Sequence, residues 1–78
     1  MEIEDKLLKE IGLRIKNIRQ EKGIPQQDLA DICNFEKSNM CRIEKGKNNL
    51  TVKTLFKISR ALEVTIKELV DVLENNLI

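Results

Sequence analysis

Lys37, Ser38, Asn39 and Arg42 lie in one short stretch, and the side chain of each ends in a hydrogen-bonding group. Arginine pairs bidentately with O6 and N7 of guanine, asparagine with N6 and N7 of adenine, and serine with either kind of base. A helix that carries such residues on its outer face fits the major groove of a duplex. The stretch is therefore a candidate for contact with base edges.

The positive charge of the chain is concentrated in its middle. Residues 37–60 contain seven lysine and arginine residues against one acid, Glu44, which gives a net charge of +6. Residues 1–10 carry −2, residues 11–36 carry 0 and residues 61–78 carry −3, so the whole chain is at +1. Two interpretations stay open, a solvated helix face and an anionic partner that binds the middle of the chain.

Length and composition exclude several classes of protein. The 78 residues, 41% apolar and 35% charged, suit one small folded domain. No apolar run approaches the roughly 20 residues of a membrane span, and the acidic N-terminus does not resemble a signal peptide. Two cysteines are too few for a disulfide framework, and the absence of histidine removes the commonest general base and most zinc sites. We expect a cytoplasmic protein that is not an enzyme and has no cofactor, metal or small-molecule ligand.

Apolar residues recur at spacings of three and four, which predicts an all-α fold with no strand. The five expected helices cover about residues 3–22, 26–33, 36–45, 52–63 and 65–75. Their inward faces are expected to include Ile11, Ile15, Ile18, Leu29, Ala30, Cys33, Phe35, Met40, Ile43, Leu55, Phe56, Ile58, Ala61 and Leu62. The fifth helix is expected to carry Ile66, Leu69, Val70 and Leu73 on one side. Gly12 interrupts the apolar stripe of the first helix, and a close contact with another helix would explain it.

The breaks between helices carry residues that suit turns and caps. Gly23 and Gly46 are placed to end helices, and Asn34 is the residue best able after glycine to adopt a left-handed turn. Thr51 is expected to cap the fourth helix, and Thr65 is expected to form a capping box with Glu68. Residues 26–45 are then two short helices joined by a tight turn.

Residues 11–69 resemble the phage-repressor (Cro/CI, or XRE) helix-turn-helix family, which has a five-helix, lambda-repressor-like fold. The segments that carry the resemblance include QQDLA at 26–30, MCRIEKG at 40–46 and LFKISRAL at 55–62. The resemblance implies that residues 26–45 form the helix-turn-helix, with the second of its helices entering the major groove.

The resemblance also implies roles for single residues. Lys37, Ser38 and Arg42 match positions that read base edges, and Asn39 lies beside them. Contacts to the sugar-phosphate backbone are implied for Gln26, Lys45, Lys47, Asn48 and Asn49. Arg19 and Glu44 match a structural pair that joins the first helix to the third. Cys41 stands on the outer face, either as an ordinary small residue or as a redox-sensitive thiol.

The fifth helix and the tail contain more apolar residues than a five-helix core should absorb. These are Leu69, Val70, Val72, Leu73, Leu77 and Ile78. Such clusters usually find a partner, so we expect a homodimer through residues 65–78. A two-fold dimer would place two recognition helices about 34 Å apart and would require a palindromic operator.

Two functions are consistent with this sequence. The first is a sequence-specific transcription regulator that binds double-stranded DNA. The second is a protein-binding module of the antitoxin type, which would use the acidic ends at residues 1–10 and 66–78 on the same fold. Affinity for a duplex that falls steeply with salt would favour the first.

Overall fold

The computed structural model describes residues 3–71, and within them the chain forms five helices and no strand. The helices are α1 (Ile3–Glu21), α2 (Gln26–Cys33), α3 (Lys37–Glu44), α4 (Val52–Leu62) and α5 (Ile66–Val70). The expected all-α, five-helix fold is confirmed. The third helix begins one residue later than expected, because Glu36 has extended backbone angles and serves as its N-cap. The expected continuation of the fifth helix to about residue 75 lies beyond the described residues.

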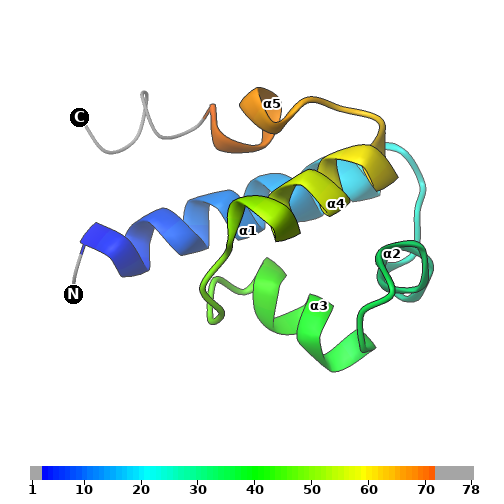
Figure 1. The fold of residues 1–78 in the computed structure, drawn as a ribbon, viewed down its shortest axis with the longest axis horizontal. Coiled ribbons are helices and arrows are strands. Elements are labelled where there is room, and N and C mark those ends of the chain that lie inside the picture. The colour runs from blue at the N-terminus through cyan, green and yellow to red at the C-terminus, as the bar shows by residue number, and fades with distance from the viewer. Residues whose placement is uncertain (1–2, 72–78) are drawn as a thin grey trace.

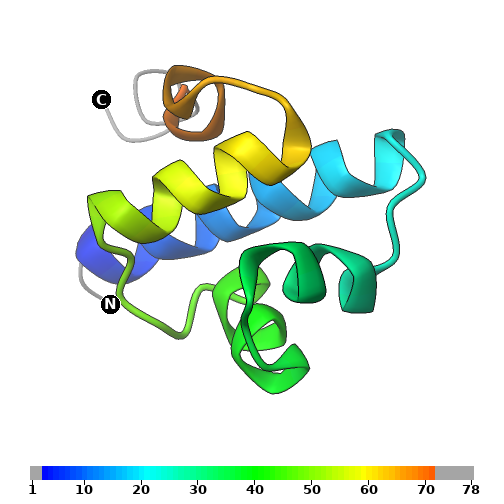
Figure 2. The ribbon, with the colours of Figure 1, turned by 45° about the vertical axis from the view of Figure 1, so that its right-hand side comes forward.

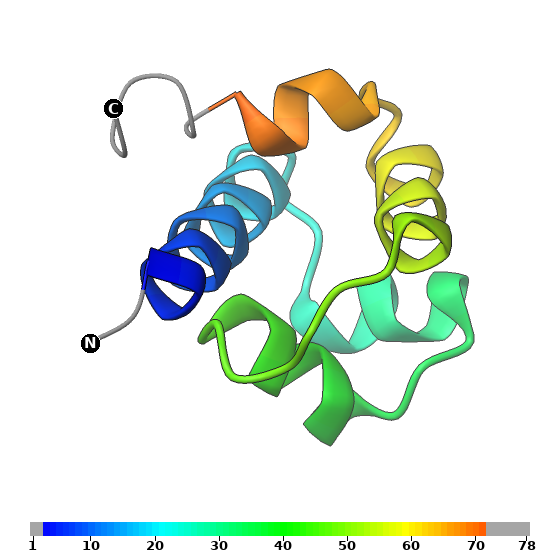
Figure 3. The ribbon, with the colours of Figure 1, turned by 60° about the vertical axis from the view of Figure 1, so that its left-hand side comes forward.

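The longest helix, α1, runs through the middle of the molecule with α4 alongside it (Figure 1). In Figure 3, where α1 is seen nearly end on, the other four helices are arranged around a shared interior. There α1 contacts α3, α4 and α5, while α2 contacts α3 and α4. The α2–turn–α3 unit is at one edge and α5 is at the opposite edge in Figures 1, 2 and 3.

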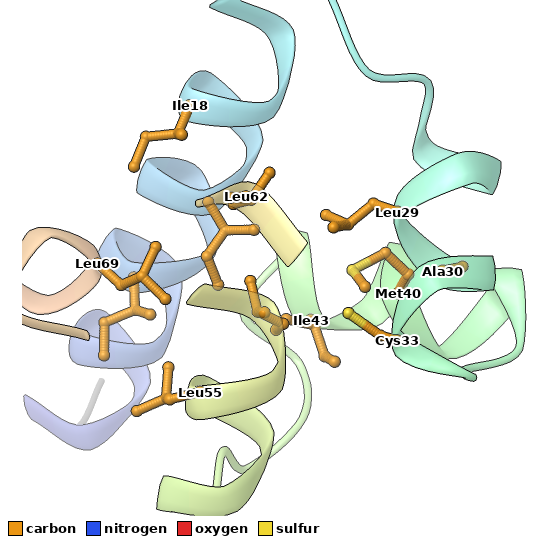
Figure 4. Packing of buried hydrophobic residues seen from close by; sticks show 12 residues of the cluster. Ile18, Leu29, Ala30, Cys33, Met40, Ile43, Leu55, Leu62 and Leu69 are labelled. Atoms are coloured by element: carbon orange, nitrogen blue, oxygen red, sulfur yellow. The ribbon is translucent and has the colours of Figure 1, made fainter. Parts of the chain in front are cut away.

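One apolar core joins all five helices (Figure 4). Its largest fully buried side chains are Ile15, Leu29, Met40, Ile58, Leu62 and Leu69. Because α2, α3 and α5 have only eight, eight and five residues, none is long enough to be stable alone. Packing into this common core therefore holds the short helices in place.

Phe56 does not lie in this core, contrary to the expectation from the sequence. Its side chain is 51% exposed, because Leu55, Ile58 and Leu62 already form the inward face of α4 and Phe56 is turned away from them. The guanidinium of Arg60 lies over its ring, 5.8 Å from the centroid. With Ile32, Phe56 borders an open groove of about 460 Å³ between α2 and α4.

The predicted turn and cap residues have the expected local structure. Asn34 is left-handed, with φ of 62°, and its backbone amide bonds to carbonyls at the end of α2. Thr51 Oγ1 accepts a hydrogen bond from the backbone amide of Thr54 at 3.0 Å. Thr65 and Glu68 form the expected capping box at the start of α5. These caps fix the residues at which the helices begin and end, which packing into the core alone does not define.

Gly12 lies where α1 passes over the end of α3. A methyl group at this position would overlap the backbone carbonyl of Ile43 and would lie 2.6 Å from that of Glu44. The close approach explains why a glycine occurs inside a helix, where it is unfavourable by about 1 kcal/mol relative to alanine. None of the helices in residues 3–71 is sufficiently long and apolar to cross a membrane.

Candidate nucleic-acid interface

Backbone hydrogen bonds close the end of α2 and form the turn that leads to α3. The amide of Phe35 donates to the carbonyl of Ala30 at 2.8 Å, and the amide of Asn34 donates to that of Asp31 at 3.1 Å. Ala30 is fully buried in the core. The turn that leads from α2 to α3 therefore has a defined backbone conformation.

The outer face of α3 is hydrophilic and uncovered by the rest of residues 3–71. Lys37, Ser38, Arg42 and Lys45 are exposed, while Met40 and Ile43 point into the core. Ser38 and Arg42 are four residues apart, so they lie on the same side of the helix. Figures 1 and 2 show α3 along the lower edge of the molecule, with its outer side open to solvent. Asn39 and Cys41 lie on the two flanks of this face and are half-buried.

Arg19 and Glu44 meet beneath this face. Nε of Arg19 donates to Oε2 of Glu44 at 2.7 Å, and Nη2 donates to Oε1 at 3.1 Å. Nε2 of Gln26 donates to the same Oε1 at 2.9 Å. Thus α1, the start of α2 and the end of α3 are joined at one carboxylate. The side-chain amide of Gln26 is held by this network, whereas its backbone is at the N-terminus of α2.

A cavity of about 250 Å³ lies beside this network. Its lining residues are Lys16, Arg19, Gln26, Cys41, Glu44 and Lys45. The sequence does not indicate Lys16 as a candidate for contact with DNA, because it lies on α1, outside the basic block at 37–60. The spacing of three between Lys16 and Arg19 was the available signal, since it places both side chains on one face of the helix.

The loop after α3 forms the other flank of the face. The amide of Lys47 donates to the carbonyl of Arg42 at 2.9 Å, which ties the loop to the end of α3. Lys47 and Asn49 are exposed. The side chain of Asn48 instead turns inward, and its Nδ2 donates to Oδ1 of Asn39. The sequence places Asn39 and Asn48 near the interface and does not reveal that their side chains bond to each other.

The residues expected at a dimer interface differ in how far they are buried within their own protomer. Leu69 is fully buried in the core of its own protomer and has no surface to offer a second copy, so its assignment to an interface is wrong. The reason is that α5 packs on both α1 and α4, and Leu69 is its inward residue. Val70 is half-buried. Four further expected residues, Val72, Leu73, Leu77 and Ile78, lie outside the described residues.

The two cysteines are in different surroundings. Cys33 is buried, and its Sγ lies 3.8 Å from the backbone carbonyl of Lys57. Burial raises the pKa of the Cys33 thiol, and the nearby Lys57 ammonium partly offsets this. Cys41 is half-buried beside the cavity. Cys33 thus has the surroundings of a packing residue.

A sequence profile described as helix-turn-helix matches residues 15–69, well over half of the chain. The chain belongs to this helix-turn-helix family. Its relatives include control protein C.BamHI of Bacillus amyloliquefaciens, 34% identical over 61 residues that cover 77% of this chain and 75% of that protein. HTH-type transcriptional regulator SinR of Bacillus subtilis is 37% identical over 62 residues, which are 78% of this chain but only 56% of SinR.

Solved structures of helix-turn-helix regulators have the same fold. The restriction-modification controller protein C.Esp1396I, solved as a tetramer in complex with its natural 35 base-pair operator, superposes with a TM-score of 0.77 at 38% identity. The superposition covers 88% of this chain and 91% of that protein. As a member of the family, the chain described here is a DNA-binding transcriptional regulator of the helix-turn-helix type.

Proposed function

We propose that this regulator binds a palindromic operator as a homodimer and places α3 of each protomer in the major groove. The observation that carries the proposal is the outer face of α3, which is hydrophilic, cationic and uncovered by the rest of residues 3–71. A helix that presents such a face at the edge of a helix-turn-helix unit has the shape and the chemistry to contact base edges.

Sequence choice is assigned to the exposed residues of α3. Arg42 lies in the last turn with its guanidinium free of any ion pair to residues 3–71, so its paired donors are available to O6 and N7 of guanine. Ser38 lies one turn before it on the same side, and Lys37 stands at the start of the helix. Asn39 contributes from the flank next to the 45–51 loop.

Affinity is assigned to groups on both flanks of α3. On one side, α2 begins at Gln26 without a side-chain cap, which leaves backbone N–H groups of its first turn available to a phosphate, and Lys45 lines the same cavity as Gln26. We add Lys16 to this phosphate-contacting set. On the other side stand Lys47 and Asn49, both exposed. Two cationic flanks around one recognition helix match the two phosphate backbones that border a major groove.

The dimer is assigned to the edge that carries α5. An interface at α5 leaves the face of α3 uncovered, because the two helices lie apart in all three ribbon views (Figures 1, 2 and 3). Val70 and the residues expected to follow it, Val72, Leu73, Leu77 and Ile78, supply the apolar surface. Leu69 supports this interface only from within, because it anchors α5 to its own core.

This function is tested by selecting bound duplexes from a random pool. The affinity of the chain for the most enriched duplex is then measured at several salt concentrations. We expect a palindrome with half-site centres one duplex turn apart, and an affinity that falls by orders of magnitude between 50 and 200 mM salt if about six or more phosphates are contacted. Sedimentation of the complex should give two chains per duplex. Absence of any enriched sequence, together with affinity that does not change with salt, would favour the protein-binding alternative.

A further inference from the structure

Exposed large apolar side chains gather on α2 and α4. Among residues 3–71 such side chains occur at Ile32 on α2, at Val52 and Phe56 on α4, and at Leu13 on α1. Ile32 and Phe56 line the open groove of about 460 Å³ between these two helices, the α2–α4 groove. Val52 lies one turn before Phe56 on the same side of α4. Apolar surface that gathers in one place, rather than being scattered, marks an interaction site.

The α2–α4 groove is also positively charged. Lys57 and Arg60 line it, and none of the described residues that line it is acidic. Over its whole length α4 carries three cations, the third being Lys53, and no acid. Within residues 3–71 neither Lys57 nor Arg60 forms an ion pair. The groove therefore combines an apolar lining with two positive charges that the described part of the chain does not neutralise.

Two aromatic rings hold these cations at the groove. Nζ of Lys57 lies over the ring of Phe35, 5.6 Å from its centroid, and the guanidinium of Arg60 lies over that of Phe56 at 5.8 Å. The face of an aromatic ring attracts a cation, yet it takes up none of the N–H groups that a carboxylate would need. Both cations are thus kept beside the apolar lining, where one ligand can meet them together.

The groove lies apart from the outer face of α3. Helix α2 packs on both α3 and α4, and the groove is on the α4 side of α2. In Figure 3, α3 lies at the lower edge of the molecule and α4 at the right-hand edge. Lys37, Ser38 and Arg42, which are exposed on α3, do not line the groove. A ligand in the groove therefore leaves the outer face of α3 uncovered.

We propose that the α2–α4 groove is the docking site for an acidic amphipathic helix of a partner protein. Apolar residues of such a helix, spaced three or four apart, enter a groove of this kind. Here they pack on Ile32 and Phe56, while flanking carboxylates pair with Lys57 and Arg60. Opposite charge is required, because covering these cations with a neutral or basic segment would leave them desolvated and unpaired. The docking does not depend on DNA at α3, and a dimer through α5 leaves one groove open in each protomer.

The docking is tested by selecting peptides on the full chain. A library of helical peptides with randomised surfaces is displayed and enriched on the immobilised wild-type protein. The enriched peptides are expected to carry apolar residues three or four positions apart, flanked by aspartate or glutamate. Their affinity is then measured by fluorescence anisotropy at about 0.15 M salt, where exposed charges more than about 8 Å apart are largely screened. Enrichment of no peptide, or of basic peptides, would refute the docking site.

The apolar part of the groove is tested with Phe56→Ala and Ile32→Ala. Each should lower the affinity for the selected peptides, Phe56→Ala by roughly tenfold or more because an aromatic anchor at the centre of the contact is lost. Leu13→Ala removes an exposed apolar side chain from α1 and is the matched control, with an affinity within about twofold of the wild-type value. Thermal melts check that each variant is folded. Equal affinities for all four proteins would overturn the proposal.

The charged part of the groove is tested with the double variant Lys57→Glu and Arg60→Glu. Its affinity for the acidic peptides should fall by roughly tenfold or more, because like charges then face each other. A repeat of the selection on this variant should enrich basic peptides instead. The control is Lys6→Glu with Lys22→Glu, which changes the net charge equally at two exposed residues that do not line the groove. The control should keep the wild-type preference for acidic peptides.

Two further measurements identify other occupants of the groove. If Lys57→Glu with Arg60→Glu weakens duplex binding more than its control does and the peptides still bind, these cations serve DNA and the docking site is refuted. If Phe56→Ala changes the self-association of the chain in sedimentation, the occupant is a second copy and a separate partner is refuted. Loss of peptide binding with duplex affinity and self-association unchanged supports the docking site, whether or not an operator is selected.

Discussion

The guanidinium of Arg19 and the carboxylate of Glu44 form a two-point ion pair inside the protein. Two N–H groups of Arg19 donate to the two carboxylate oxygens at 2.7 and 3.1 Å, and a third donates to the backbone carbonyl of Ile24 at 2.9 Å. Gln26 adds another hydrogen bond to Glu44. Both charges are buried, yet each is paired and hydrogen-bonded, which is the condition under which such charges are tolerated. The pair fixes α3 relative to α1 and to the start of α2.

We predict that Arg19→Ala destabilises the fold strongly, because it leaves the buried carboxylate of Glu44 without its cation. Removing one partner of a buried pair costs about 3–5 kcal/mol. For a domain of this size, each kcal/mol lowers the melting temperature by roughly 4–8 °C. Thermal unfolding followed by circular dichroism measures the effect. The double variant Arg19→Met with Glu44→Leu should recover much of the loss, since it removes both charges. A single variant that melts like the wild-type chain would refute the structural role of the pair.

We predict that Gly12→Ala is destabilising although alanine is the better helix former. Propensity alone would favour the variant by about 1 kcal/mol. The added methyl group, however, would collide with backbone atoms of Ile43 and Glu44, and backbone cannot move aside as a side chain can. Asn17→Ala, at an exposed position of the same helix, is the control and should be neutral or slightly stabilising. Denaturant titration of both variants gives the comparison, and an increase in stability for Gly12→Ala would show that α1 and α3 do not pack this closely.

We predict that Arg42→Ala and Lys47→Ala impair DNA binding in different ways. Arg42 is assigned a bidentate base contact, so its loss should cost about 1–3 kcal/mol on the operator and relax the preference at one base pair. Lys47 is assigned a phosphate contact, so its loss should weaken binding to all duplexes alike. It should also reduce the slope of log affinity against log salt concentration by about one. Affinities for the operator and a scrambled duplex at several salt concentrations separate the two effects. The reverse pattern would show that α3 docks differently.

We predict that an alkylating reagent modifies Cys41 before Cys33 in the folded protein. Cys33 is buried, and burial raises the pKa of its thiol, so less of the reactive thiolate is present at a given pH. Cys41 is half-exposed beside the cavity. As pH rises toward the raised pKa of Cys33, its rate should increase but should stay below that of the unfolded chain. Peptide mass spectrometry after timed labelling measures both sites, and equal rates in the native state would contradict the packing of α2 on α4.

Local sequence signals predicted the elements of this protein well, because each rests on neighbouring residues. The three- and four-residue spacing of apolar side chains gave the helices, and Asn34, Thr51 and the pair Thr65 and Glu68 gave their ends. The outward face of α3 also followed from periodicity, since Met40 and Ile43 had to point inward. These features depend on contacts within a few residues of the chain, where spacing alone decides which side chains meet.

Tertiary packing decided the features that join distant residues. Phe56 was expected in the core, but only one face of α4 packs against the neighbouring helices. Phe56 is not on that face. Leu69 was expected at a dimer interface, but it is fully buried in the core, where α5 packs on α1 and α4. The bonds from Gln26 to Glu44 and from Asn48 to Asn39 join side chains 18 and 9 positions apart. Such partners depend on the angles at which helices cross and loops return, and no periodicity in the sequence encodes them.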